Sequence, residues 1–567
     1  MSSPAAVLPT HVRRAAGWIS VARDRLLAVR PLYVLSTLLA VQWAALAALA
    51  VTVRHNGWVY YMGGDQLWHY SSAYLLAHGE LPPTYVGVGW STLLAPISWI
   101  AGPDLVSAVP FIIVFNALVL VPLATLCLYG IAARIGGRLF GYWAALLWIV
   151  LPYAGIRYAL TGYHQKYTEL TLPQILGLGA MSDFPSVVAL LVGAYLCLRA
   201  VDSGHWLWGA GAGFATGYAL AIKPSNTVFL IAPALLFLVF RRRTLIPFIL
   251  GLGPPLLLLA VWKERGYGHI PLFAAPPPTH RVALGIGDVL HPWSRYTGTN
   301  SWTQLHNNLI QLREQLWSDR VLEFLAIGGI VALVIRSRRA GLFVGSWFLA
   351  FLLLKGTYIN ARVEDGSFWR LLLPAFPAFV VMVAAIPLLL PGLRLRPTRP
   401  TPIRLPRRLV AGAVAGLVLV LVLLPVTVIA GAKPSRQPNV GALELNATLV
   451  PVSGVFRLHA KQENGRVTLT WNAERPSGGD VFYRVFRTES PAGTDGTVCA
   501  GVPRNVPDQC TLAANTQSVG TTRRSTLEDM PGPGRWAYRI GLSANWLDDP
   551  NFGDVYVFSR PVTIKVP

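Results

Sequence analysis

The sequence predicts a mainly α-helical, polytopic membrane protein that ends in a β-sandwich outside the membrane. The 567-residue chain is 53% hydrophobic and only 13% charged, about half the charged share of a typical soluble protein. Apolar runs near the length of about 20 residues that crosses a bilayer recur through the first three quarters of the chain. From about Pro451 onward, apolar and polar residues alternate instead, as they do in β-strands.

The apolar runs predict about eleven transmembrane helices. We place them near residues 33–53, 107–131, 140–156, 184–199, 205–221, 226–240, 244–262, 320–335, 341–355, 369–390 and 409–431. The first 30 residues hold five arginines and lack the short apolar core and cleavage site of a secretory signal. We therefore expect the first apolar run to remain in the membrane.

Arginines orient these helices. With the N-terminus in the cytoplasm, the inner segments hold twenty arginines and two acids, Asp24 and Asp202. Lysine and arginine favour the cytoplasmic side, so we expect a multi-pass protein of the plasma (inner) membrane with a cytoplasmic N-terminus. An odd number of spans places the C-terminal domain outside the cell. The net charge of +22 then reflects topology and attraction to anionic membrane lipid, not nucleic-acid binding.

The chain divides into a transmembrane domain, 1–432, and an extracytoplasmic domain, 433–567. Segments such as GRVTLTWNA and RWAYRIGLSA alternate as short strands between Gly- and Pro-rich turns, which indicates a β-sandwich. The pattern resembles a fibronectin type III domain, with Trp471 and Tyr538 at the family's tryptophan and tyrosine positions. A long insertion, 488–525, departs from that family. The sandwich is expected to bind glycan or position an acceptor, or else to be a passive cap.

Two of the four cysteines, Cys499 and Cys510, lie in this insertion. An oxidising location outside the cell favours a disulfide between them, which would close the long loop. Metal binding is the rival interpretation, but two cysteines without nearby histidines supply too few ligands. Cys127 and Cys197 fall in apolar helices and are expected to pack there.

The stretch GGDQLWHYSSAY opens the first long outer loop with an acid, Asp65. A helix that begins here would be capped by Asp65 and would place His69 and Ser72 on the same face. An N-cap is the simple explanation for such an acid. A carboxylate at the membrane rim is nevertheless costly to keep in a chain with only 26 acids, and such residues mark functional sites in membrane proteins.

Three motifs together resemble the GT-C glycosyltransferases. The first is Asp65-Gln66 with Tyr70, followed by Tyr74-Leu-Leu-Ala-His-Gly79. The second is the Gly-rich stretch GFATGYALAIKPSNTVFLIAPALLF, which contains Lys223, and the third is SFWRLLLPAFPAFVV, which contains Arg370. Many members of that family have a second acid where this chain has Gln66.

The resemblance implies transfer of a sugar, a hexose or pentose, from a polyprenyl-phosphate donor to a glycan, glycolipid or protein acceptor of the cell envelope. The acceptor hydroxyl needs a base as it attacks, and the leaving phosphate needs fixed positive charge. Single displacement would invert the anomeric centre. We expect Asp65 and Glu169 to be catalytic, Arg370, Lys223 and Lys166 to bind the donor phosphate, and His69, Tyr70, His164, Glu364 and Asp365 to contact the acceptor or sugar.

Alternative functions stay open at this stage. No Walker loop, GxGxxG, HExxH or GxSxG motif occurs in a fitting context. A divalent metal near Asp65 is conceivable, although no ligand spacing indicates one. A transporter or flippase of lipid-linked sugars would require ionisable groups at the helix midplanes and paired repeats, and a non-catalytic scaffold would keep Asp65 and Arg370 apart.

Overall fold

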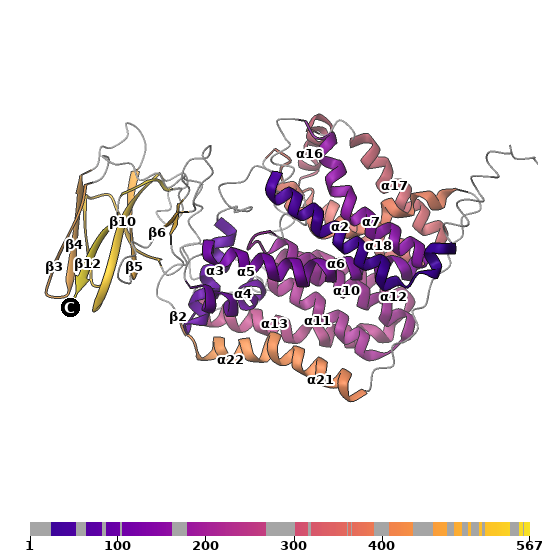
Figure 1. Cartoon of the computed structure of the whole chain (residues 1–567), viewed down its shortest axis with the longest axis horizontal. Helices are drawn as coiled ribbons and strands as arrows, with labels where there is room; N and C mark the ends of the chain where they lie inside the picture. Colours follow the sequence, from indigo (N-terminus) through magenta and orange to yellow (C-terminus); the bar gives the residue numbers. More distant parts are fainter. Residues whose placement is uncertain are drawn as a thin grey trace, which may run out of the picture.

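A computed structural model describes most of the chain (Figure 1). The described residues are 24–52, 64–81, 87–102, 105–160, 178–267, 301–315, 319–359, 361–364, 366–390, 407–434, 457–472, 481–489, 497–499, 510–512, 516–544, 555–559 and 561–567. Figure 1 shows a bundle of helices and two facing sheets, whose strands come from the C-terminal part of the sequence. The structure thus confirms a mainly helical fold with a C-terminal β region.

Helices dominate up to residue 431 because long apolar runs must satisfy their backbone groups internally in a membrane. The α-helices are α2 (Pro31–Thr52), α3 (Gly64–Ala77), α4 (Val88–Ala101), α5 (Leu105–Phe115), α6 (Val121–Gly136), α7 (Arg138–Tyr158), α10 (Asp183–Ser203), α11 (Trp206–Ile222), α12 (Ile231–Phe240), α13 (Leu245–Tyr267), α16 (Trp302–Gln315), α17 (Asp319–Arg336), α18 (Arg338–Lys355), α19 (Ser367–Leu372), α20 (Phe376–Ala385), α21 (Arg407–Val418) and α22 (Leu424–Gly431). Short 3₁₀ or π segments join several of them, among them η1 (Asn116–Leu120), η3 (Pro224–Leu230), η4 (Arg242–Thr244), η5 (Leu373–Ala375), η6 (Ile386–Leu389) and η7 (Leu419–Leu423).

Every predicted apolar segment falls on a helix, but the count of eleven spans is not confirmed. Within the described residues, seven helices are long and apolar enough to cross a membrane. They cover Pro31–Ala48, Ala108–Gly136, Arg138–Tyr158, Asp183–Ser203, Arg242–Arg265, Ser367–Leu389 and Val414–Gly431. Three further apolar helices are shorter, and one of them, Val88–Ala101, lies in the predicted first outer loop. That loop therefore contains two helices, α3 and α4.

The helices share one core, which includes the buried tryptophans Trp90, Trp148, Trp262 and Trp347. Glycines allow the closest approach: α11 packs directly on α13, where a methyl group at Gly213 would overlap the carbonyl of Phe248. The end of α22 is tied back to the first outer loop. There β1 (Glu80–Leu81) pairs in parallel with β2 (Lys433–Pro434), and the Arg265 guanidinium donates to the Ala432 carbonyl at 2.6 Å.

The C-terminal strands form two sheets around a common core. One sheet has the order β3 (Arg457–Glu463), β4 (Arg466–Asn472), β9 (Thr526–Asp529). The other has the order β11 (Val555–Phe558), β10 (Gly534–Ala544), β5 (Val481–Glu489), β8 (Thr516–Thr522), with β12 (Val562–Val566) also paired to β10. Trp471 and Tyr538 meet in the core between the sheets, as expected of a β-sandwich.

The insertion contains a small hairpin of β6 (Thr497–Cys499) and β7 (Cys510–Leu512). Its antiparallel register places the backbone of Cys499 directly opposite that of Cys510. Directly opposed residues of such a pair lie about 4.5–5.5 Å apart at Cα, within the span of a disulfide. The disulfide itself stays a prediction, and Cys127 and Cys197 are free and buried in the helical core.

Candidate functional site

A buried carboxylate bridges two cations at one end of the helical bundle. Asp183 Oδ1 lies 2.5 Å from Lys223 Nζ, and its Oδ2 lies 3.2 Å from Arg370 Nη2. The Asp183 side chain has no exposed surface, whereas those of Lys223 and Arg370 keep 18% and 28% of theirs. Lys223 and Arg370 were both predicted to bind a phosphate, and the structure brings them to one carboxylate.

Asp183 is the first residue of α10 and is preceded by Ser182. A carboxylate is favourable here because the first turn of a helix has free N–H groups and a positive dipole end. The Ser186 hydroxyl donates to the Asp183 carbonyl at 2.8 Å, which stabilises the same turn. The sequence SDFPS therefore starts the helix and fixes the carboxylate at its end.

Lys223 lies at the sharp turn between α11 and η3. Its backbone is extended, with φ −140° and ψ 96°, because the following Pro224 disfavours the helical conformation for the residue before it. The side-chain amide of Asn226 donates to the Ala219 carbonyl at 3.3 Å and closes the turn. Gly87, directly before α4, packs on this turn, and a methyl group there would overlap the Ile222 carbonyl, which only glycine allows.

Arg370 lies in the short helix α19. The preceding Gly366 has a positive φ of 80°, a conformation that glycine adopts without strain. The Phe368 amide donates to the Arg362 carbonyl at 3.0 Å, and the Arg362 amide donates to the Ser367 hydroxyl at 2.9 Å. This tight turn directs the first residues of the third sequence motif toward α10.

Lys355 is a further basic residue near this cluster. It is the last residue of α18 and is 5% exposed, and α18 packs against η3, which begins directly after Lys223. Lys223 and Arg370 carry two positive charges, and Asp183, which pairs with both, supplies one negative charge. The cluster is therefore net positive, which suits an anionic ligand.

The segment Leu178–Asp183 connects this cluster to α3. Gln66 is fully buried, and its side-chain oxygen accepts from the Ala180 amide at 2.5 Å. The Trp90 indole donates to the Ala180 carbonyl at 2.7 Å. The side-chain amide of Asn116 donates to the Gly179 carbonyl at 3.2 Å. Gln66 thus holds the backbone that leads to Asp183.

The other predicted residues of the first loop have mixed positions. Asp65 is the second residue of α3, directly before Gln66, and its side chain lies outside the described part of the chain. His69 is buried, with its Nδ1 3.5 Å from the Ser91 hydroxyl. Tyr70 is also buried, and its hydroxyl donates to the Gly102 carbonyl at 2.6 Å. The sugar-binding role of His69 and Tyr70 stays a prediction beside these packing contacts.

Of the remaining predicted site residues, the structure describes Glu364. Glu364 is exposed, and its carboxylate accepts from Gln311 at 2.8 Å. The structure does not bring it to Asp183 by any described contact. His164, Lys166, Glu169 and Asp365 lie outside the described residues. In the part of the chain that is described, no group of three or more metal-binding side chains occurs.

Sequence reasoning did not identify Asp183 or Lys355 as site residues. A signal for Asp183 was present, because it is an acid at the start of an apolar helix on the predicted outer side, as Asp65 is. No comparable signal marks Lys355, which looks like one more charge at a helix end. Its burial beside Lys223 depends on the packing of α18 against η3.

No protein-family model matches the chain, and no curated protein matches it. Solved structures of the Archaeoglobus fulgidus oligosaccharyltransferase are similar to it. The structure tethered with an acceptor peptide is 14% identical, covers 72% of this chain and 56% of its own, and has a TM-score of 0.43. The AglB complex with an inhibitory peptide and a dolichol-phosphate is 14% identical, covers 71% and 56%, and has a TM-score of 0.42.

A third structure of that enzyme, a complex with Zn and sulfate, is 14% identical, covers 70% of this chain and 54% of its own, and has a TM-score of 0.40. The chain thus spans just over half the length of these solved proteins. Identities and TM-scores this low do not transfer an activity, so the function is argued from the residues of this chain alone.

Proposed function

We propose that this protein is a membrane glycosyltransferase that moves a sugar from a polyprenyl-phosphate donor to a cell-envelope acceptor. The observation that carries the proposal is the Asp183–Lys223–Arg370 cluster. It joins two of the three motifs that resemble GT-C enzymes, through side chains 40 and 187 residues apart in the chain. The third motif, around Asp65, is connected to it through Gln66 and Ala180.

The cluster is suited to hold the donor phosphate. Arg370 and Lys223 are partly exposed, so a phosphate can reach them, while Asp183 is fully buried behind them. A guanidinium can contact two phosphate oxygens at once, and the ammonium of Lys223 acts as a point charge. In this proposal Asp183 positions both cations before the donor binds, and the net positive charge stabilises the phosphate as it leaves.

Asp65 is the proposed general base. It precedes Gln66, whose contact with Ala180 brings the start of α3 to the segment that ends at Asp183. The acceptor oxygen forms a bond to the anomeric carbon while its proton passes to the Asp65 carboxylate. The bond between that carbon and the phosphate oxygen breaks, and its electron pair leaves with the phosphate. Attack opposite the leaving group inverts the anomeric centre.

The C-terminal strands complete the proposal. We place them outside the cytoplasm as a fibronectin type III-like domain with a Cys499–Cys510 disulfide. The pairing of β1 with β2 holds the entry to this domain against the first loop, directly after α3, where an acceptor would approach Asp65. Mass spectrometry of the protein under non-reducing conditions tests the disulfide, because closure removes two hydrogens.

Transfer assays with the purified full-length protein test the function. Polyprenyl-phosphate sugars are supplied as donors with envelope extracts as acceptors, and products are followed by a label on the sugar. Asp65→Asn should lower the rate about 10²–10⁴-fold, the range for loss of a general base. Arg370→Gln should lower it about 10²-fold or more, the usual effect of removing one group that stabilises the transition state. Glu264→Gln, an exposed carboxylate of α13, is the matched control and should keep full activity.

Two outcomes would refute the proposal. Wild-type activity in Asp65→Asn would remove the base. Transbilayer movement of the intact donor in liposomes, without sugar transfer to any acceptor, would favour a flippase instead.

A further inference from the structure

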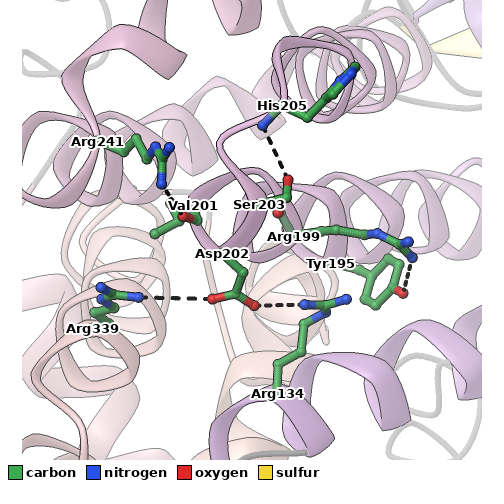
Figure 2. Close-up of polar contacts among 9 residues, drawn as sticks. All are labelled: Arg134, Tyr195, Arg199, Val201, Asp202, Ser203, His205, Arg241 and Arg339. Carbon is green, nitrogen blue, oxygen red and sulfur yellow. Dashed lines mark hydrogen bonds and ion pairs between the residues drawn. The ribbon is translucent and has the colours of Figure 1, made fainter. Parts of the chain in front are cut away.

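A second charged cluster surrounds Asp202 (Figure 2). Asp202 Oδ2 lies 2.6 Å from Arg134 Nη1, and its Oδ1 lies 3.9 Å from Arg339 Nη1. Arg199 and Arg241 lie at the same helix ends, and in the described chain their polar contacts are with neutral groups. Four arginines, from α6, α10, α18 and the end of α12, thus lie at these helix ends. In the described chain Asp202 is the only carboxylate that pairs with any of them, which leaves about three positive charges unneutralised.

The guanidinium groups are held in place. Arg199 lies over the Trp208 ring at 4.0 Å and donates to the Tyr195 hydroxyl at 3.1 Å. Arg241 donates to the Val201 carbonyl at 3.3 Å, and Gly204, with a φ of 69°, leaves the space that its guanidinium occupies. Aromatic stacking and these bonds reduce the entropy lost when the arginines bind an anion.

The cluster lies at the opposite end of α10 from Asp183. The helix has 21 residues, so at 1.5 Å per residue the two ends are about 30 Å apart, the thickness of the hydrocarbon core. The cluster is thus at the membrane surface away from the proposed catalytic site. The helix α11 also begins here at Trp206, and the positive end of its dipole favours an anion.

An apolar surface continues from the arginines into the membrane. Next to Arg241 in the chain, Val239 is 61% exposed and Ile246 is 66% exposed, and Leu250 one turn further is 70% exposed. Trp206, the first residue of α11, is 62% exposed, and tryptophan is enriched at membrane interfaces. This combination matches a phospholipid, with its phosphate on the arginines and its chains along α12 and α13.

We propose that Arg134, Arg199, Arg241 and Arg339 form a binding site for the headgroup of an anionic phospholipid. Arginines that only orient the helices would not need an aromatic platform such as the Trp208 ring under Arg199. A soluble phosphate would bind the same guanidinium groups but would make no use of the exposed apolar side chains. The proposal is independent of the transfer reaction.

Binding measurements on the full-length protein in detergent test this site. Phosphatidylglycerol, phosphatidylcholine and soluble glycerol 3-phosphate are titrated separately, and bound lipid is counted by native mass spectrometry. The wild-type protein should retain phosphatidylglycerol in preference to phosphatidylcholine. Each arginine near a membrane surface contributes about fivefold to such binding, so Arg199→Gln with Arg241→Gln should weaken phosphatidylglycerol binding about 25-fold. Arg242→Gln with Arg243→Gln removes the same two charges outside the contacts of Figure 2 and serves as the control.

Asp202→Asn gives a test in the other direction. Removal of the only carboxylate drawn in the cluster should strengthen phosphatidylglycerol binding severalfold, a gain that a misfolded variant would not produce. Equal losses of binding in the Arg199–Arg241 double variant and in the control double variant would indicate a diffuse charge effect and would overturn the proposal. Equal binding of glycerol 3-phosphate and the lipid, or no preference over phosphatidylcholine, would overturn it as well.

Discussion

Asp183→Asn tests whether the buried bridge organises the outer end of the bundle. The substitution keeps the shape of the side chain but removes its charge from between Lys223 and Arg370. Breaking a buried ion pair by removing one partner typically costs 3–5 kcal/mol, because a charge is left uncompensated. Lys223 and Arg370 keep 18% and 28% of their side-chain surface, so water can solvate them in part, and we expect about 3 kcal/mol.

Asp202→Asn is the matched comparison, because it changes the same residue type at the other end of the same helix. The Asp202 side chain is 39% exposed, and exposed ion pairs contribute about 0–1 kcal/mol. Unfolding of both variants in mixed micelles, followed by tryptophan fluorescence, should therefore separate them by about 2 kcal/mol. A double-mutant cycle of Asp183→Asn with Arg370→Gln should give a coupling energy of at least about 1 kcal/mol.

Equal losses of stability in Asp183→Asn and Asp202→Asn would contradict this reasoning. A coupling energy near zero in the cycle would contradict it independently, since it would mean that the 3.2 Å contact of Asp183 with Arg370 does not stabilise the fold.

Three further variants test other contacts. Gly87→Ala forces a methyl group against the Ile222 carbonyl, so unfolding should show a loss of about 1–3 kcal/mol, the cost of overpacking. Gln66→Ala removes the acceptor of the buried Ala180 backbone amide. It should lower the free energy of unfolding by about 1–3 kcal/mol and slow sugar transfer. Tyr538→Phe removes a 2.7 Å hydrogen bond to Asp529 and should cost about 1 kcal/mol of the C-terminal unfolding transition, measured by denaturant titration. Burial, and then Asp529, raise the pKa of Tyr538, so this loss should not depend on pH in the neutral range.

Controls separate these effects from general damage. Gly253→Ala changes a glycine of α13 whose added methyl group meets no atom within 4 Å, and it should be neutral or slightly stabilising. If Gly87→Ala and Gly253→Ala were equally stable, the close approach of Gly87 to Ile222 would have no effect on stability. Gln66→Glu keeps the length of the side chain, but it buries a charge against Ala180 and should be more destabilising than Gln66→Ala.

Much of the fold follows from local patterns in the sequence. The apolar runs predict where helices form, because a membrane leaves the backbone no other hydrogen-bonding partners over such lengths. Alternation predicts the C-terminal strands, and it correctly places Trp471 in a shared core. The number of spans was less predictable, because helices such as α4 are apolar but short, and composition does not distinguish a short span from a buried helix.

By itself, the sequence determined the helical and β-strand regions and the choice of Lys223 and Arg370 as phosphate-binding candidates. Only the tertiary structure decided that Asp183 joins them and that Gln66, an apparent replacement for an acid, instead holds the backbone before Asp183. The physical reason is distance along the chain. The two ion pairs link residues 40 and 187 positions apart, and no local pattern of polarity records which charges meet when the helices pack.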